Sequence, residues 1–197
     1  MKKILLSALI VSSLISIQGQ SVMYSVNFSG LNESPPNASL GIGTGTVVYD
    51  GTAHTMALSA SFSGLLGPVT QTHIHGPTAV AFTGTSGIAV GNPSLPGFPL
   101  GVTSGTYANT MDLTLNSSYN NTFLANNGGT AASAEAALAA AMLAGKTYWN
   151  IHSTSVPGGE IRGFLTVVPE PSSIALAGLG VIGLAVRASH KRRASKA

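Results

Sequence analysis

The sequence predicts an all-β, antiparallel protein with one short inserted α-helix and an apolar segment at each end. Several stretches of the chain alternate apolar and polar residues, which is the pattern of strands with one buried face. The 24 glycines and 10 prolines among the 197 residues separate these stretches from one another. Only one stretch, rich in alanine, has the composition of a helix. A chain of this length fits one domain or two small ones.

Composition and charge exclude several classes of protein. The absence of cysteine excludes a disulfide scaffold, a cysteine metal site, a cysteine nucleophile and a lipid-modified cysteine. Seven of the nine basic residues lie at the two ends of the chain. Between residues 20 and 168, two basic and five acidic residues leave a net charge of −3. No nucleic-acid partner is expected, because phosphate neutralisation requires clustered lysines and arginines.

Residues 1–21 have the pattern of a secretory signal peptide. Lys2 and Lys3 precede a short apolar run from Ile4 to Val11. A buried N-terminal helix is the alternative, but such a helix would show a polar face. We expect cleavage near Gly19 or Ser21.

The last 29 residues, 169–197, have the pattern of a second targeting signal. The motif at 168–173 is followed by an apolar helix at 174–186 and a basic tail at 187–197. The 13 apolar residues span about 20 Å as a helix, so insertion into a hydrocarbon core of ~30 Å requires the flanking serines and a snorkelling arginine. The positive-inside rule places the basic anchor in the cytoplasm, and its residues are Arg187, Lys191, Arg192 and Arg193.

This arrangement resembles the PEP-CTERM sorting signal, with the motif Val168-Pro169-Glu170-Pro171. The resemblance implies export through the inner membrane, a transient membrane anchor, and cleavage by an exosortase-type protease. Release to the cell surface or extracellular matrix would follow. An ordinary C-terminal membrane anchor after a proline-rich break is the alternative.

The body of the chain is predicted to consist mainly of strands, with turns at Asp50-Gly51 and at the proline-rich segment 76–101. Leu138 and Met142 would pack the alanine-rich helix on the sheet, and Gly145 would end it. The expected strands cover residues 22–28, 44–49, 54–63, 69–75, 88–90, 107–115, 147–153 and 160–168, and the helix covers residues 133–144.

Three histidines are the candidate metal ligands. His73 and His75 are two residues apart on a predicted strand, so both side chains lie on the same face. His152 lies on the polar phase of another strand, as Asn150 does. Neutral imidazole is the commonest metal ligand, which makes copper or zinc the candidate cofactor. The alternative is a hydrogen-bonded structural network without a cofactor, built on Asn150, Glu160 and Arg162.

Three blocks of the sequence resemble the CHRD domain, which was named from chordin. They are His73-Ile74-His75-Gly76-Pro77, Tyr148-Trp149-Asn150-Ile151-His152-Ser153 and Pro157-Gly158-Gly159-Glu160-Ile161-Arg162-Gly163. The resemblance spans residues 22–168 and implies an immunoglobulin-like β-sandwich, similar to that of Cu/Zn superoxide dismutase. The chain lacks the additional His and Asp of a dismutase copper–zinc pair, so dismutase activity is not expected.

Two functions are consistent with these features. The first is a non-enzymatic extracellular interaction module that contacts matrix polysaccharide or surface proteins. The second is an extracellular metal-binding protein that holds a redox-active or structural metal at His73, His75 and His152. We expect no enzymatic activity, because the sequence presents no convincing catalytic constellation.

Overall fold

The computed structural model describes residues 21–169 of the chain. The predicted signal peptide up to residue 20, Glu170 and Pro171 of the sorting motif, the apolar helix and the basic tail lie outside the described residues. Within 21–169, neither helix is long and apolar enough to cross a membrane.

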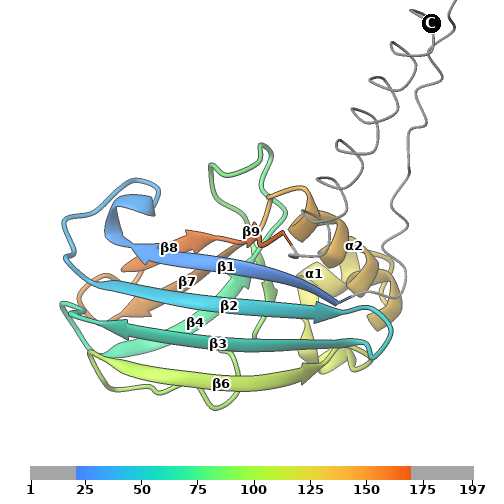
Figure 1. Cartoon of the computed structure of the whole chain (residues 1–197), viewed down its shortest axis with the longest axis horizontal. Helices are drawn as coiled ribbons and strands as arrows, with labels where there is room; N and C mark the ends of the chain where they lie inside the picture. Colours follow the sequence, from blue (N-terminus) through green and yellow to red (C-terminus); the bar gives the residue numbers. More distant parts are fainter. Residues whose placement is uncertain (1–20, 170–197) are drawn as a thin grey trace, which may run out of the picture.

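Nine antiparallel strands form a sheet that curls on itself (Figure 1). The spatial order is β5-β4-β7-β8-β1-β2-β3-β6, and β9 pairs with β1 beside this path. All the expected strands are present, and the last predicted strand is divided into β8 and β9. The strands are β1 (Ser21–Ser29), β2 (Ile42–Asp50), β3 (Thr55–Ser63), β4 (Val69–His75), β5 (Ile88–Val90), β6 (Gly105–Asp112), β7 (Tyr148–Ser153), β8 (Ile161–Phe164) and β9 (Thr166–Val167).

Two α-helices, where the sequence predicted one, pack at one end of the sheet (Figure 1). Helix α2 (Ala131–Leu143) begins two residues before the predicted start, because Thr130 and Ser133 form a reciprocal capping box. The additional helix, α1 (Asn121–Asn126), is capped by the Asn120 side chain. Six residues are too few to show a helical period, so the sequence pattern gave no indication of α1. Two 3-10 turns, η1 (Gly30–Asn32) and η2 (Asn116–Ser118), complete the described elements.

The hydrophobic core lies between the two facing halves of the curled sheet. Trp149 of β7 is fully buried at its centre. Its ring lies 5.4 Å from that of Phe28 and 6.1 Å from that of Tyr107, measured between centroids. The indole N–H donates a hydrogen bond of 2.8 Å to Thr72 Oγ1, so the one polar atom of the ring is satisfied within the core. This burial fixes β7 against β1 and β6.

Side chains along β4 and β7 point alternately into the hydrophobic core and to the opposite face of the sheet. Ile74 and Ile151 point inward and are fully buried, as expected from their phase. The neighbouring positions therefore lie on the opposite face, where the register pairs His73 with Asn150 and His75 with Tyr148. In the pairing of β7 with β8, Asn150 is opposite Arg162, so His73, Asn150 and Arg162 lie side by side on three adjacent strands.

Candidate metal centre

His73 and His75 of β4 and His152 of β7 come together on this outer face. Each residue offers one ring nitrogen, and the three nitrogens all lie within 4.8 Å of one another. His73 is 1% exposed, whereas His75 and His152 are partly exposed. The convergence follows from the antiparallel pairing of β4 with β7, which places the histidines on adjacent strands.

Each imidazole uses its other ring nitrogen to contact a backbone carbonyl. Such a contact fixes the tautomer, because only a protonated nitrogen donates to a carbonyl. The remaining nitrogen of a neutral ring then carries a lone pair. The contacts are His73 Nε2 to Pro93 O at 2.6 Å, His75 Nδ1 to Ser86 O at 2.9 Å, and His152 Nδ1 to Pro157 O at 2.8 Å.

The three remaining nitrogens face one another without enough protons to satisfy them. His73 Nδ1 and His152 Nε2 lie 3.2 Å apart, and in the neutral rings neither carries a hydrogen. His75 Nε2 is buried and has no hydrogen-bond partner within residues 21–169. Buried polar atoms are normally paired, and three ring nitrogens that face one another as acceptors could together hold a cation.

Burial keeps these rings in the neutral form that binds metals. Burial lowers the pKa of His73 and that of His152 below the ordinary 6.5. The same cause lowers the pKa of His75 to about 4, and the nearby positive charge of Arg162 contributes in the same direction. At neutral pH a metal ion would therefore have few protons to displace from the site.

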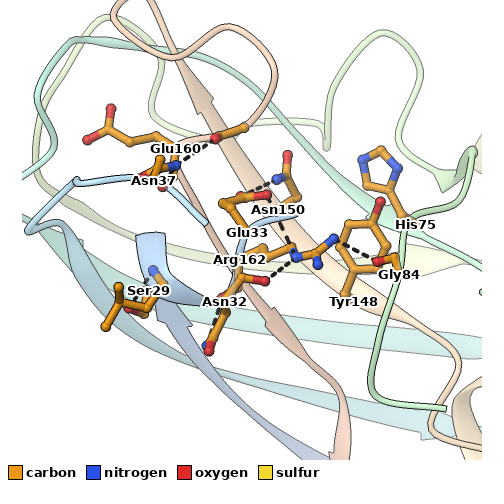
Figure 2. Close-up of polar contacts among 12 residues, drawn as sticks. Ser29, Asn32, Glu33, Asn37, His75, Gly84, Tyr148, Asn150, Glu160 and Arg162 are labelled. Atoms are coloured by element: carbon orange, nitrogen blue, oxygen red, sulfur yellow. Dashed lines mark hydrogen bonds and ion pairs between the residues drawn. The ribbon is translucent and has the colours of Figure 1, made fainter. Parts of the chain in front are cut away.

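An aromatic and cationic stack supports the His75 ring. The ring of Tyr148 is stacked on it, with 4.8 Å between centroids and 3° between planes. The guanidinium carbon of Arg162 lies 4.6 Å from the centroid of the Tyr148 ring (Figure 2). The Tyr148 hydroxyl donates to Ser86 O, which His75 also contacts. The stack and the shared carbonyl together hold His75 in one orientation.

A buried polar network lies beside the stack. Asn150 donates from Nδ2 to Glu33 Oε1 at 2.6 Å, and Arg162 Nε lies 3.7 Å from Glu33 Oε2 (Figure 2). Arg162 also donates from Nε to Asn32 O and from Nη1 to Gly84 O. Burial raises the pKa of Glu33 to about 7, although Arg162 and Asn150 oppose the change. Asn150, Arg162 and Glu33 therefore form one buried polar network.

Glu160, which the sequence placed in one network with Asn150 and Arg162, lies apart from these two residues, and Glu33 is the carboxylate beside Arg162. The Glu160 side chain accepts hydrogen bonds from Ser39 Oγ and from the backbone N–H of Leu66. Figure 2 shows its carboxylate directed away from Arg162. The sequence carries no signal for Glu33, because this residue follows the 3-10 turn η1 in an irregular loop, where no periodic pattern indicates the direction of a side chain.

The three histidines could supply three of the ligands of a transition metal. Imidazole nitrogens bind zinc at about 2.0–2.1 Å, which places them about 3–4 Å from one another. The His73–His152 separation of 3.2 Å already satisfies this condition. A movement of roughly 1 Å by the remaining nitrogen would close the shell, and a fourth position would stay open for water or a small ligand.

Comparison with protein families agrees with both resemblances found in the sequence. The model of the CHRD domain matches residues 24–165. The model of the PEP-CTERM protein-sorting motif matches residues 167–193. Neither the curated proteins nor the solved structures gave a significant match to the chain.

Proposed function

The chain belongs to the CHRD domain family and carries a PEP-CTERM protein-sorting motif, and from this premise we propose that it is an exported protein whose CHRD domain binds one copper or zinc ion. His73, His75 and His152 would hold the metal. The role would be binding rather than catalysis.

The sorting motif indicates how the protein is exported. PEP-CTERM signals imply processing by an exosortase-type membrane enzyme and export to the cell surface or extracellular space. We further propose that residues 1–21 are removed as a signal peptide and that the domain becomes part of the extracellular matrix. An immunoglobulin-like sandwich, related in architecture to that of Cu/Zn superoxide dismutase, is the fold type that we propose for the curled sheet.

The observation that carries the metal proposal is that the three imidazole rings direct one nitrogen each toward a common point. The other nitrogen of each ring contacts the backbone carbonyl of Pro93, Ser86 or Pro157, and the nitrogens near the common point lie within 4.8 Å of one another. A metal-binding histidine usually donates its second N–H to a carbonyl or a carboxylate in this way.

The donor set favours copper or zinc over hard cations. Imidazole suits zinc and copper, whereas magnesium and calcium prefer oxygen ligands. Bound copper would give the site redox activity, and bound zinc would not.

A metal titration of the purified protein tests this proposal. We expect one equivalent of Cu²⁺ or Zn²⁺ to remain after dialysis, as measured by elemental analysis. The His73→Ala/His152→Ala double variant should lose this equivalent. His54→Asn is the matched control, because His54 lies outside the cluster and asparagine tolerates its positive φ of 54°. Unchanged retention in the folded double variant, or none in the wild type, would contradict metal binding.

An interaction module for matrix polysaccharide or surface proteins is the second candidate. Large apolar side chains are exposed where β1 ends, β2 begins and β3 ends, and an exposed apolar group of this kind is typical of a contact surface. These residues are Leu31, Leu40, Ile42 and Leu66. Exopolysaccharide from the producing cells should co-sediment with the wild type and much less with a Leu40→Asp/Leu66→Asp variant. Equal co-sedimentation would contradict this second role.

A further inference from the structure

A cavity at the opposite end of the sheet contains a second polar cluster, which the metal centre does not use. The cavity has a volume of about 610 Å³ and lies between helix α2 and the ends of β1 and β2. Its walls are mostly apolar, with Val22 and Tyr24 on one side and an alanine face of α2 on the other. The volume lies within the range of pockets that hold small organic ligands.

A buried carboxylate forms the polar part of this cavity. Glu135 of α2 is 5% exposed. Its Oε1 accepts a hydrogen bond of 3.1 Å from the Tyr49 hydroxyl, and its Oε2 lies 2.8 Å from His54 Nδ1. Burial raises the pKa of Tyr49 to about 12, so this hydroxyl keeps its proton and donates. Each carboxylate oxygen has a second lone-pair position, which a ligand can use.

His54 is held at the rim of the cavity in an uncommon conformation. Its φ of 54° lies in the left-handed region, which non-glycine residues seldom adopt. The residue belongs to the turn before β3 rather than to the strand in which the sequence pattern placed it. The 2.8 Å contact between Nδ1 and Glu135 Oε2 orients the ring, and the side chain is 52% exposed.

The charges around this cluster are predominantly acidic. Asp50 and Asp112 both lie close enough to His54 for their charges to interact with it. No lysine or arginine is among the cavity-lining residues in the described part of the chain. An apolar wall beside acidic groups complements a molecule that joins a cationic group to an apolar body.

We propose that this cavity binds a small organic ammonium ion, with its N–H groups directed to the Glu135 carboxylate and its hydrocarbon part against the alanine face of α2. A hydrogen bond between an ammonium and a carboxylate is stronger than a neutral one, and the surrounding apolar wall limits competition from water. This binding site is independent of the metal centre.

Three probes of equal chain length test the proposal by calorimetric titration of the purified protein. We expect hexylammonium to bind at least about tenfold more tightly than hexanol or hexanoate, because only the ammonium can donate charge-assisted hydrogen bonds to Glu135. Binding should also raise the melting temperature.

Two variants and a matched control assign the site. Glu135→Gln keeps the shape of the side chain and should weaken hexylammonium binding at least about tenfold. Glu33→Gln makes the same change at the other end of the sheet and should have no effect. Ala136→Trp, at an exposed position that lines the cavity, should block binding without removing the carboxylate.

Equal binding of hexanoate and hexylammonium would overturn the proposal. Unchanged hexylammonium affinity in folded Glu135→Gln would do the same. Should Glu135→Gln fail to fold, wild-type affinity in the folded Ala136→Trp variant would overturn it.

Discussion

Glu33 couples the polar network to pH. Its folded-state pKa of about 7 exceeds the ordinary 4.5, so between these values the folded protein holds a proton that the unfolded chain has released. The free energy of unfolding therefore falls as the pH rises through this window. We expect the wild type to lose up to about 3 kcal/mol relative to Glu33→Gln between pH 4.5 and 7.5. Urea unfolding of both proteins measures the difference, and a constant difference would contradict the raised pKa.

Gly159 closes the network from the loop between β7 and β8. Its φ is 131°, and an added Cβ would collide with Asn150 Nδ2 and lie 2.9 Å from Glu33 Oε1. We expect Gly159→Ala to lower the free energy of unfolding by about 1–3 kcal/mol or more. An added Cβ at Gly158 meets no atom within 4 Å, so Gly158→Ala is the control and should change stability little. Equal effects of the two substitutions would contradict the prediction, because they would show that the close approach at Gly159 does not affect the free energy of unfolding.

At the scale of elements, the start of α2 depends on its cap. Thr130 Oγ1 accepts a hydrogen bond from the backbone N–H of Ser133, and the Ser133 side chain returns a contact to Thr130 N. Loss of such a cap costs about 1 kcal/mol. Thr130→Ala should therefore lower the thermal stability, whereas the exposed Thr122, without a side-chain hydrogen bond in the described structure, should tolerate alanine. Circular dichroism melting of the two variants compares them, and equal melting temperatures would exclude a contribution from the cap.

At the scale of the whole molecule, the sorting motif directly follows the folded sheet. β9 pairs with β1, and the backbone N–H of Val168 donates to Met23 O at 2.8 Å. Cleavage at Pro169-Glu170-Pro171 would therefore leave every strand of the sheet intact. We expect mass spectrometry of surface-released protein to show an N-terminus near residue 20 and a C-terminus close to this motif. Released protein that still contains Arg192 and Arg193 would contradict this route.

The sequence by itself determined the strands, the alanine-rich helix and the family. These features are local, since the alternation in residues 69–75 reports one buried face wherever the strand pairs. The same alternation placed Ile74 and Ile151 in the core and the three histidines on the opposite face. The motif at residues 168–171 is equally local, because it is a short linear pattern.

Only the tertiary structure decided which side chains meet. Glu33 beside Arg162, Glu160 with Ser39, and Glu135 with His54 all join residues more than 80 positions apart in the chain. Loops or turns place one member of each pair, and loop conformation depends on the surface against which the loop packs rather than on a repeating pattern. The carbonyl groups that contact the three histidine rings belong to Ser86, Pro93 and Pro157, which also lie in loops or turns. The identity of the candidate ligands was therefore readable from the sequence, but the direction of their lone pairs was not.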